Sequence, residues 1–323
     1  ANATGMTFRG IANGWLGTVG VDSNGLYYNA PSNTSIGFQF TGVEKASVTA
    51  QGAISAAYYQ VNGSTVLAML PGVASLGVGV EAGRINTATQ NTFVGVQAGY
   101  ANTTGAGNSF LGYRAGYANT TGAANSFIGK SVAYSNTTGS NNTFLGFEAG
   151  LSNISGNNNA YLGNAAGYYN QTGAGNSVVG SQAGHGASGQ SYSSSTLVGY
   201  QAGYNLNSSV GNILIGYQAG FSITTGTGNI VIGYNEDVYS PTDNNVLNIG
   251  GVLFGELQDK TIGINSFLPT TPVKPQAALD VISTGTAANV YAQIWRDSDG
   301  LVVSSVSAQG VFYGNGSGLR NVI

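Results

Sequence analysis

The stretch Asn91–Gly107, NTFVGVQAGYANTTGAG, is followed directly by Asn108–Ala124, NSFLGYRAGYANTTGAA, and the two match at an offset of 17 residues. The glycine that closes the apolar triplet recurs at steps of 16 or 17 residues, with one step of 19 that carries an insertion near residues 186–194. These glycines are Gly79, Gly95, Gly112, Gly129, Gly146, Gly163, Gly180, Gly199, Gly216, Gly233 and Gly250. A fixed period of this length indicates a solenoid in which each repeat forms one coil.

The residue before each closing glycine is always aliphatic, and we expect this column to form the inner core ladder. It consists of Val78, Val94, Leu111, Ile128, Leu145, Leu162, Val179, Val198, Ile215, Ile232 and Ile249. Seventeen residues have room for two or three strands of about five residues with corners between them. The sequence therefore predicts an all-β fold, a parallel β-solenoid or β-roll of about eleven 17-residue turns.

One residue earlier runs a second apolar column, which we expect on the opposite face because side chains alternate along a strand. Its members are Phe93, Phe110, Phe127, Phe144, Tyr161, Val178, Leu197, Leu214 and Val231. A lone solenoid needs only its inner face dry, and an aromatic stripe several turns long exceeds what monomers expose. This second column predicts a homotrimer with Phe93, Phe110, Phe127 and Phe144 at the contact between subunits.

Further columns carry polar, small and aromatic residues. Four residues before the glycine we expect a stacked asparagine ladder, made of Asn91, Asn108, Asn125, Asn142, Asn159 and Asn176, and continued by Asn212 and Asn229. Three residues after the glycine, alanines such as Ala98 and Ala115 mark a tight corner. Tyr100 and Tyr117 begin an aromatic column two residues further on.

Composition narrows the class of protein. Only 7% of the 323 residues are charged and the net charge is −3, yet 42% are hydrophobic, which favours folding over disorder. The chain has no basic patch that would bind nucleic acid and no apolar run of the roughly 20 residues that a membrane span needs. Without cysteine there are no disulfides or thiolate zinc sites, and the redox compartment stays undecided.

The ends read as β-hairpins around the turns Asp22–Gly25, Asn62–Gly63 and Asp297–Gly300. Ser47–Gly52, SVTAQG, recurs as Ser305–Gly310, SVSAQG, so the C-terminus repeats a module that precedes the solenoid. We therefore expect four parts. They are an N-terminal hairpin module at 1–70, the solenoid at 71–255, a linker at 256–275 and a C-terminal β module at 276–323.

The phrase NTxxGxxAGYxNTTG, over about residues 75–250, resembles repeats in trimeric phage tail fibres and bacterial tail-fibre-domain proteins. Thr261–Asn265, Ala278–Val281 and Gly314–Leu319 are similar to segments that precede a C-terminal chaperone domain in such proteins. Self-cleavage of that domain, frequent in the family, and truncation explain the ending at Ile323 equally. The repeat is also similar in kind to the β-roll heads of trimeric autotransporter adhesins, which use a shorter turn. The resemblance implies an extracellular trimeric fibre, on a virion or a cell, that attaches to surfaces; it names no receptor, and a surface glycan is one candidate.

Residues for catalysis are few. His185 is the only histidine and falls in the aromatic column, so a serine triad is nearly excluded. Glu236, Asp237 and Asp243 could supply the paired carboxylates of a glycosidase, but they lie in a degenerate last turn that favours a solvated cap. Asp297 and Asp299 lack the other ligands of a calcium loop and favour a hairpin turn. We expect no enzyme, cofactor or metal.

Four points remain open. A tail fibre or tailspike would bind or cleave a receptor glycan, and an ice-binding solenoid is suggested by steps such as Thr103–Thr104. Asn102, Asn119, Asn136, Asn153 and Asn170 all lie in Asn-x-Ser/Thr sequons, where a ladder role competes with glycosylation. Finally, Leu319, Val322 and Ile323 could dock on the N-terminal module of the next trimer and build a head-to-tail filament.

Overall fold

The computed structural model describes residues 64–70 and 74–264 continuously. Outside them it describes the backbone of strands at 18–22, 25–29, 36–40, 43–48, 54–56, 58–61, 279–281, 291–296, 302–307 and 312–314. The chain divides into two compact units, Ala1–Met69 and Leu70–Ile323. Every described element in both units is a β-strand, so the described fold is all-β.

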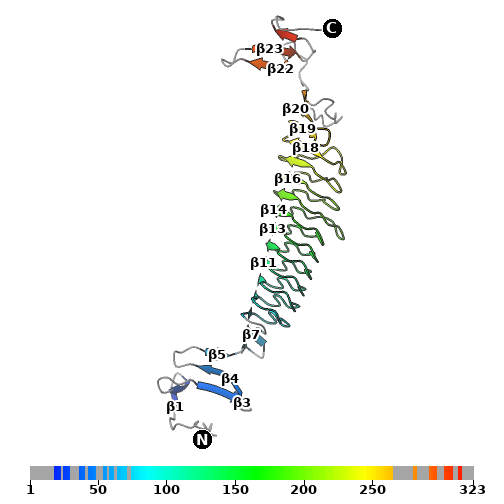
Figure 1. Cartoon of the computed structure of the whole chain (residues 1–323). Coiled ribbons are helices and arrows are strands. Elements are labelled where there is room, and N and C mark those ends of the chain that lie inside the picture. Colours follow the sequence, from blue (N-terminus) through cyan, green and yellow to red (C-terminus); the bar gives the residue numbers. More distant parts are fainter. Residues whose placement is uncertain are drawn as a thin grey trace. The chain divides into compact units, whose positions relative to one another are not determined.

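The second unit contains the predicted parallel β-solenoid (Figure 1). Eleven strands, one per coil, follow one another at the repeat period, and each pairs in parallel with the next without a slip in register. They are β8 (Leu76–Val78), β9 (Thr92–Val94), β10 (Ser109–Leu111), β11 (Ser126–Ile128), β12 (Thr143–Leu145), β13 (Ala160–Leu162), β14 (Ser177–Val179), β15 (Thr196–Val198), β16 (Ile213–Ile215), β17 (Ile230–Ile232) and β18 (Val246–Ile249). The expectation of two or three five-residue strands per coil is wrong, because each coil has one strand of three or four residues.

The rest of each coil consists of tight corners that the sequence dictates. The closing glycines lie at positive φ, for example 140° at Gly112, where a Cβ would also approach the carbonyl oxygen of Gly129 to 2.2 Å. Two residues after the closing glycine, residues such as Gln97 and Gln218 also have a positive φ, of 59° and 52°. The backbone still bonds from coil to coil at these corners: the Gly99 amide donates to the Ala115 carbonyl at 2.9 Å. Short strands therefore do not leave the stack unpaired.

The core is lined by the aromatic column and not by the aliphatic one. Phe93, Phe127 and Phe144 are fully buried, and their rings stack from coil to coil, as at 4.7 Å between Phe110 and Phe127. The expected core ladder points the other way. Its members Leu111, Ile128, Leu145, Leu162, Val179, Val198 and Ile249 are exposed, and Val78, Val94, Ile215 and Ile232 are partly exposed.

This reversal corrects two of the expectations together. The interior beside the strand is wide enough for a phenyl ring because the opposing corner is closed by glycines: a Cβ on Gly99 or Gly116 would strike the rings of Phe93 and Phe110 within 2.6 Å. Burying the larger aromatic column also removes more apolar surface from water than burying the aliphatic column would. Phe93, Phe110, Phe127 and Phe144 are therefore core residues of one chain and are not available to a second subunit.

After β18 the parallel stack changes to antiparallel pairing. β19 (Leu253–Glu256) pairs with β18 and with β20 (Thr261–Ile264), and β20 pairs in parallel with β21 (Leu279–Val281). Val246 and Phe254 are buried in this segment. The sheet thus extends past residue 255, where the solenoid was expected to give way to a linker.

The hairpins expected at the ends are present. In the first unit β1 (Thr18–Asp22) pairs with β2 (Gly25–Asn29) and β6 (Tyr58–Val61) with β7 (Ser64–Met69), both antiparallel. β3 (Ile36–Phe40), β4 (Val43–Val48) and β5 (Ile54–Ala56) form a three-stranded antiparallel sheet. In the second unit β22 (Tyr291–Arg296), β23 (Val302–Ser307) and β24 (Phe312–Gly314) form another.

The two three-stranded sheets share a pairing register as well as a sequence. In the first, Ser47 pairs with Ser55 and Val48 with Ile54. In the second, Ser305 pairs with Tyr313 and Val306 with Phe312, which are the positions equivalent by the SVTAQG and SVSAQG match. The sequence repeat at the two ends is therefore also a structural repeat.

Candidate interaction surface

The inside of the solenoid holds a continuous asparagine ladder. Asn91, Asn108, Asn125, Asn142, Asn159 and Asn176 are all buried. The side-chain oxygen of Asn108 accepts the backbone amide of Asn125 at 3.0 Å, and its side-chain nitrogen donates to the Gly122 carbonyl at 2.8 Å. The same pair of bonds recurs from coil to coil, for example at Asn142 with Asn159 and Gly156. These amides tie each coil to the next, and their burial keeps them out of contact with a ligand at the surface.

A second asparagine column is formed by the sequon residues Asn102, Asn119, Asn136, Asn153 and Asn170, which are also buried. Asn119 donates from its side-chain nitrogen to the side-chain oxygen of Asn102 at 2.7 Å and to the Gly122 carbonyl at 2.9 Å. Acceptance of a glycan would require this nitrogen to leave the core. The geometry therefore favours the ladder role over glycosylation.

The threonines that suggested ice binding are likewise used within the stack. Thr103 donates its hydroxyl to the Thr120 carbonyl at 3.0 Å, and Thr120 donates its hydroxyl to Thr137 in the same way. Their neighbours Thr104 and Thr121 stay exposed. Half of the expected hydroxyl array is thus committed to holding coils together.

The outward face of strands β9–β17 carries a regular row of exposed aliphatic side chains. Each strand presents its first and third residues, which are Thr or Ser and an aliphatic residue in most coils, as in Thr143 and Leu145. Leu111 and Leu145 are 48% and 44% exposed. Within these strands no outward residue is charged; Lys130, just after Gly129, is the nearest cation. We call this surface, the first and third residues of β9–β17, the outer strand face.

His185 lies in the aromatic column, as expected. Its ring stacks between Tyr168, at 5.0 Å, and Tyr204, at 4.8 Å between centroids. Partial burial lowers the pKa of the imidazole, which favours the neutral form. The histidine therefore acts as a ring in a stack, and the described hydrogen bond from its Nδ1 involves only the Gly186 carbonyl.

The carboxylates of the degenerate last turn accept hydrogen bonds from nearby amide groups. Asp237 accepts the amides of Ser222 and Val238 at 2.8 and 2.9 Å, and Asp243 accepts the Ser240 amide at 2.8 Å. Burial raises the pKa of Asp237, an effect opposed by these hydrogen bonds. The Glu236 carboxylate receives the Asn248 side-chain amide at 3.1 Å. This geometry suits a cap that closes the stack.

Several predicted site residues cannot be placed. Leu319, Val322 and Ile323, expected to form the end contact, lie outside the described residues, as do Asp297 and Asp299. Among the residues that the structure describes, no helix is long and apolar enough to cross a membrane.

Comparison with known proteins yields no match: no family model, no curated protein and no solved structure is similar to this chain.

Proposed function

We propose that this chain is a non-enzymatic structural protein that forms a rigid extracellular fibre for attachment to surfaces. The observation that carries the proposal is the unbroken stack of coils, in which backbone bonds, asparagine ladders and ring stacks all run along the same direction. A coil in such a stack contacts only its neighbours, and each contact repeats the last. This construction suits an extended element that bears load without charges or disulfides.

The outer strand face supports assembly of the fibre from several copies of the chain. Nine parallel strands at about 4.8 Å spacing, each with outward residues over about 7 Å, cover roughly 300 Å² of sheet before side-chain relief is counted. With its Ser and Thr rows included, that area is comparable to the largest patches on monomers. The occupant we propose is the same face of further copies, because an uncharged, regular surface of short hydroxyl and aliphatic side chains is complementary to itself.

A homotrimer forms if three such faces meet around one axis. This contact through the outer strand face replaces the expected contact through Phe93 and Phe144. In the proposed trimer, Leu111, Ile128 and Leu145 meet their counterparts and Ser109, Ser126 and Thr143 lie beside them. The proposal includes head-to-tail association through the duplicated end modules, with Leu319, Val322 and Ile323 at the contact. A surface glycan or another receptor would be the target of attachment.

Immunogold electron microscopy of the native source tests the attachment role, with antibodies raised against the purified chain. The proposal expects label on thin rods at the surface of a virion or a cell, or on released filaments. Label confined to the cell interior would overturn it.

A further inference from the structure

In the N-terminal half of the solenoid, the corners that follow the strands carry charged side chains such as Arg114 and Lys130. The Arg114 guanidinium lies over the rings of Tyr113 and Tyr117, at 5.0 and 5.6 Å from their centroids, and the Lys130 ammonium lies over Phe147 at 5.4 Å. Cations on ring faces occupy the aromatic surface and are attracted by the ring quadrupole. Tyr113 and Phe147, each 42% exposed, thus already have a cation over the ring.

In the later coils the same corner carries no cations. Residues 149–235 contain no Asp, Glu, Lys or Arg. The column directly after the closing glycine becomes Tyr200, Tyr217 and Tyr234, stacked at 5.3 and 4.9 Å between centroids. Tyr234 is 71% exposed, and the equivalent position of the next coil is Gly251, so no ring covers its second face. Tyr234 therefore ends this column with a bare ring face, and Tyr200 and Tyr217 are 43% and 40% exposed beneath it without a cation on their rings.

An amide ladder runs beside this column. The Gln201 side-chain nitrogen donates to the Gln182 side-chain oxygen at 2.7 Å, and Gln218 donates to Gln201 at 2.7 Å. A glutamine amide has two N–H groups and an oxygen with two lone pairs, and the ladder uses one of each kind. One donor and one acceptor per coil remain for another partner.

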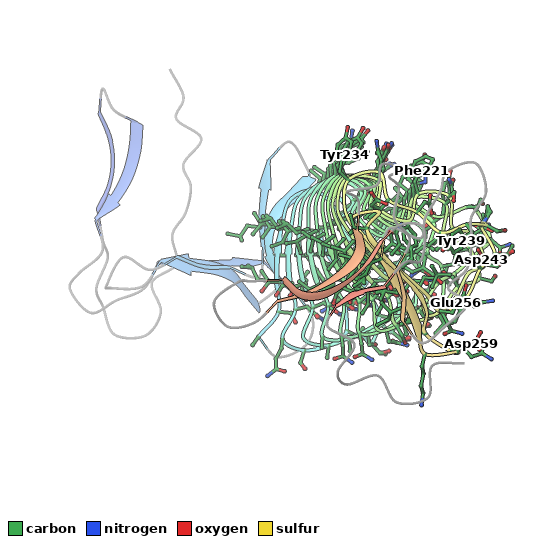
Figure 2. The ribbon with its side chains drawn as sticks, turned by 90° about the horizontal axis from the view of Figure 1, so that it is seen from above. Phe221, Tyr234, Tyr239, Asp243, Glu256 and Asp259 are labelled. Carbon is green, nitrogen blue, oxygen red and sulfur yellow. The ribbon has the colours of Figure 1, made fainter. Side chains whose placement is uncertain are left out.

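The aromatic column that begins at Tyr100 and Tyr117 borders the glutamine ladder on its other side. In this column Tyr204 stacks on Phe221 at 5.3 Å between centroids. Figure 2 looks along the stack and shows Tyr234 and Phe221 projecting outward next to each other on one side of the coils. We call this surface the neutral corner. It consists of the members of three columns within residues 182–234: the tyrosines after the closing glycines, the glutamine ladder, and the aromatic column that begins at Tyr100.

We propose that the neutral corner binds a linear, uncharged polysaccharide laid along the solenoid axis. Sugar rings offer apolar C–H faces that pack on exposed aromatic faces such as that of Tyr234. Sugar hydroxyls both donate and accept, as do the free valences of the glutamine ladder and the phenol groups. The absence of any cation argues against an anionic polysaccharide, which would need counter-charges. This inference rests on the proposed attachment role and specifies its target class.

Affinity electrophoresis in native gels tests the proposal, with hydroxyethyl cellulose, glucomannan and galactomannan as soluble neutral probes and alginate as the anionic probe. At least one neutral polysaccharide should retard the wild-type protein, and alginate should not. The double variant Tyr217→Ala/Tyr234→Ala should bind about tenfold more weakly, the size expected for lost aromatic contacts. Gln201→Leu/Gln218→Leu, which keeps the rings, should also weaken binding.

The matched control is Tyr113→Ala/Phe147→Ala, in the same column and with an exposure similar to that of Tyr217 but with a cation over each ring, and it should bind as the wild type does. Circular dichroism melting curves verify that each variant is folded. Failure of every neutral probe to retard the wild type, retardation by alginate alone, or equal loss in the control would overturn the proposal. Light scattering on the same samples measures the oligomeric mass, which tests the proposed fibre independently. A trimer that binds none of the polysaccharides would refute only the glycan site.

Discussion

Phe144 and Leu145 are adjacent and apolar, yet they occupy opposite environments. The phenyl ring is fully buried between the rings of Phe127 and Tyr161, whereas Leu145 is among the outward residues of its strand. A buried aromatic residue in a stacked column contributes to the two coils that flank it as well as to its own. The stability of the solenoid therefore depends on the column that was expected to face other subunits.

Replacement of Phe144 by alanine should lower the free energy of unfolding by about 3–5 kcal/mol, the cost of a cavity of this size in a core. Thr143→Ala, an outward residue of the same strand, should change it by less than about 1 kcal/mol. Urea denaturation followed by circular dichroism measures both. A Thr143 variant as unstable as the Phe144 variant would contradict the inward orientation of the aromatic column.

The sequence does indicate which apolar column faces inward. The indication lies in the serine and threonine column and not in the two apolar columns themselves. Two apolar columns on alternate residues do not by themselves say which is inside. Asn142 shares the face of Phe144, and Thr143 shares that of Leu145, because residues two apart point the same way. A serine or threonine column in most coils indicates the solvent side. Asparagines that satisfy each other can be buried, and this made the aromatic face harder to recognise as the core.

Asn136 provides a second test at the residue scale. Its side-chain nitrogen donates to Asn119 and to the Gly139 carbonyl, and its oxygen accepts from Asn153. Asn136→Ala leaves the buried Asn119 side-chain oxygen without this partner. The Gly139 carbonyl keeps its bond from Asn125, and the Asn153 amide keeps its bond to the Gly156 carbonyl. The loss of three bonds and the orphaned oxygen should cost about 2–4 kcal/mol in total, because an orphaned buried polar group costs about 1–3 kcal/mol. Asn164→Ala, at an exposed position, is the control and should melt within about 2 °C of the wild type. Equal melting temperatures for the two variants would rule out a stabilising ladder.

At the scale of the element, the solenoid changes its core partway along. The sequon column ends at Asn170, and the following coils have Leu206 and Ile223 buried at the corresponding position. The aromatic core column changes in step, from Phe144 to the smaller Leu197 and Leu214. In the later coils, aliphatic side chains thus replace both the sequon asparagines and the aromatic rings of the interior.

Two buried tyrosines lie at this transition. Asn170 donates to the Tyr161 hydroxyl at 2.7 Å, and the Tyr192 hydroxyl, from the inserted segment, donates to the Gly184 carbonyl at 2.9 Å. Burial is the main cause that raises the pKa of both phenols above the ordinary value of 10.0. The insertion in the coil at 180–199 thus supplies a side chain that fills the core where the two halves join.

These tyrosines predict a loss of stability in alkali. Because the folded state holds the phenols neutral, their contribution is complete below about pH 10 and is lost as pH rises, since the unfolded chain releases those protons first. Tyr161→Phe should make the melting temperature fall less steeply between pH 9.5 and 11 than in the wild type. Tyr113→Phe, which replaces an exposed ring, should leave the wild-type slope. Parallel slopes in the wild type and the Tyr161 variant would contradict the assigned burial.

At the scale of the whole molecule, the period of the repeat predicted the parallel solenoid, and turn sequences such as Asp22–Gly25 predicted the end hairpins. The single short strand per coil was not predictable from strand length rules. Most of the 17 residues of a coil belong to corners. These corners contain glycines at positive φ and also residues such as Arg114 and Glu148, at φ of 55° and 56°. Backbone hydrogen bonds between corners then do the work that longer strands would do.

The outer strand face makes the central claim measurable. If copies of the chain associate through it, the charge introduced by Leu145→Asp would be buried in every contact without a partner, whereas Thr138→Asp places the same charge at an exposed residue away from the strands. Both residues are exposed in a single chain, so neither change should unfold it.

Multi-angle light scattering on the intact protein, compared with these two variants under native conditions, is the most direct measurement. We predict a mass of three chains of 32.6 kDa, or a multiple of it, for the wild type and for Thr138→Asp, and a mass of one chain for Leu145→Asp. A single-chain mass for the wild-type protein, or a trimer unaffected by Leu145→Asp, would contradict assembly through the outer strand face.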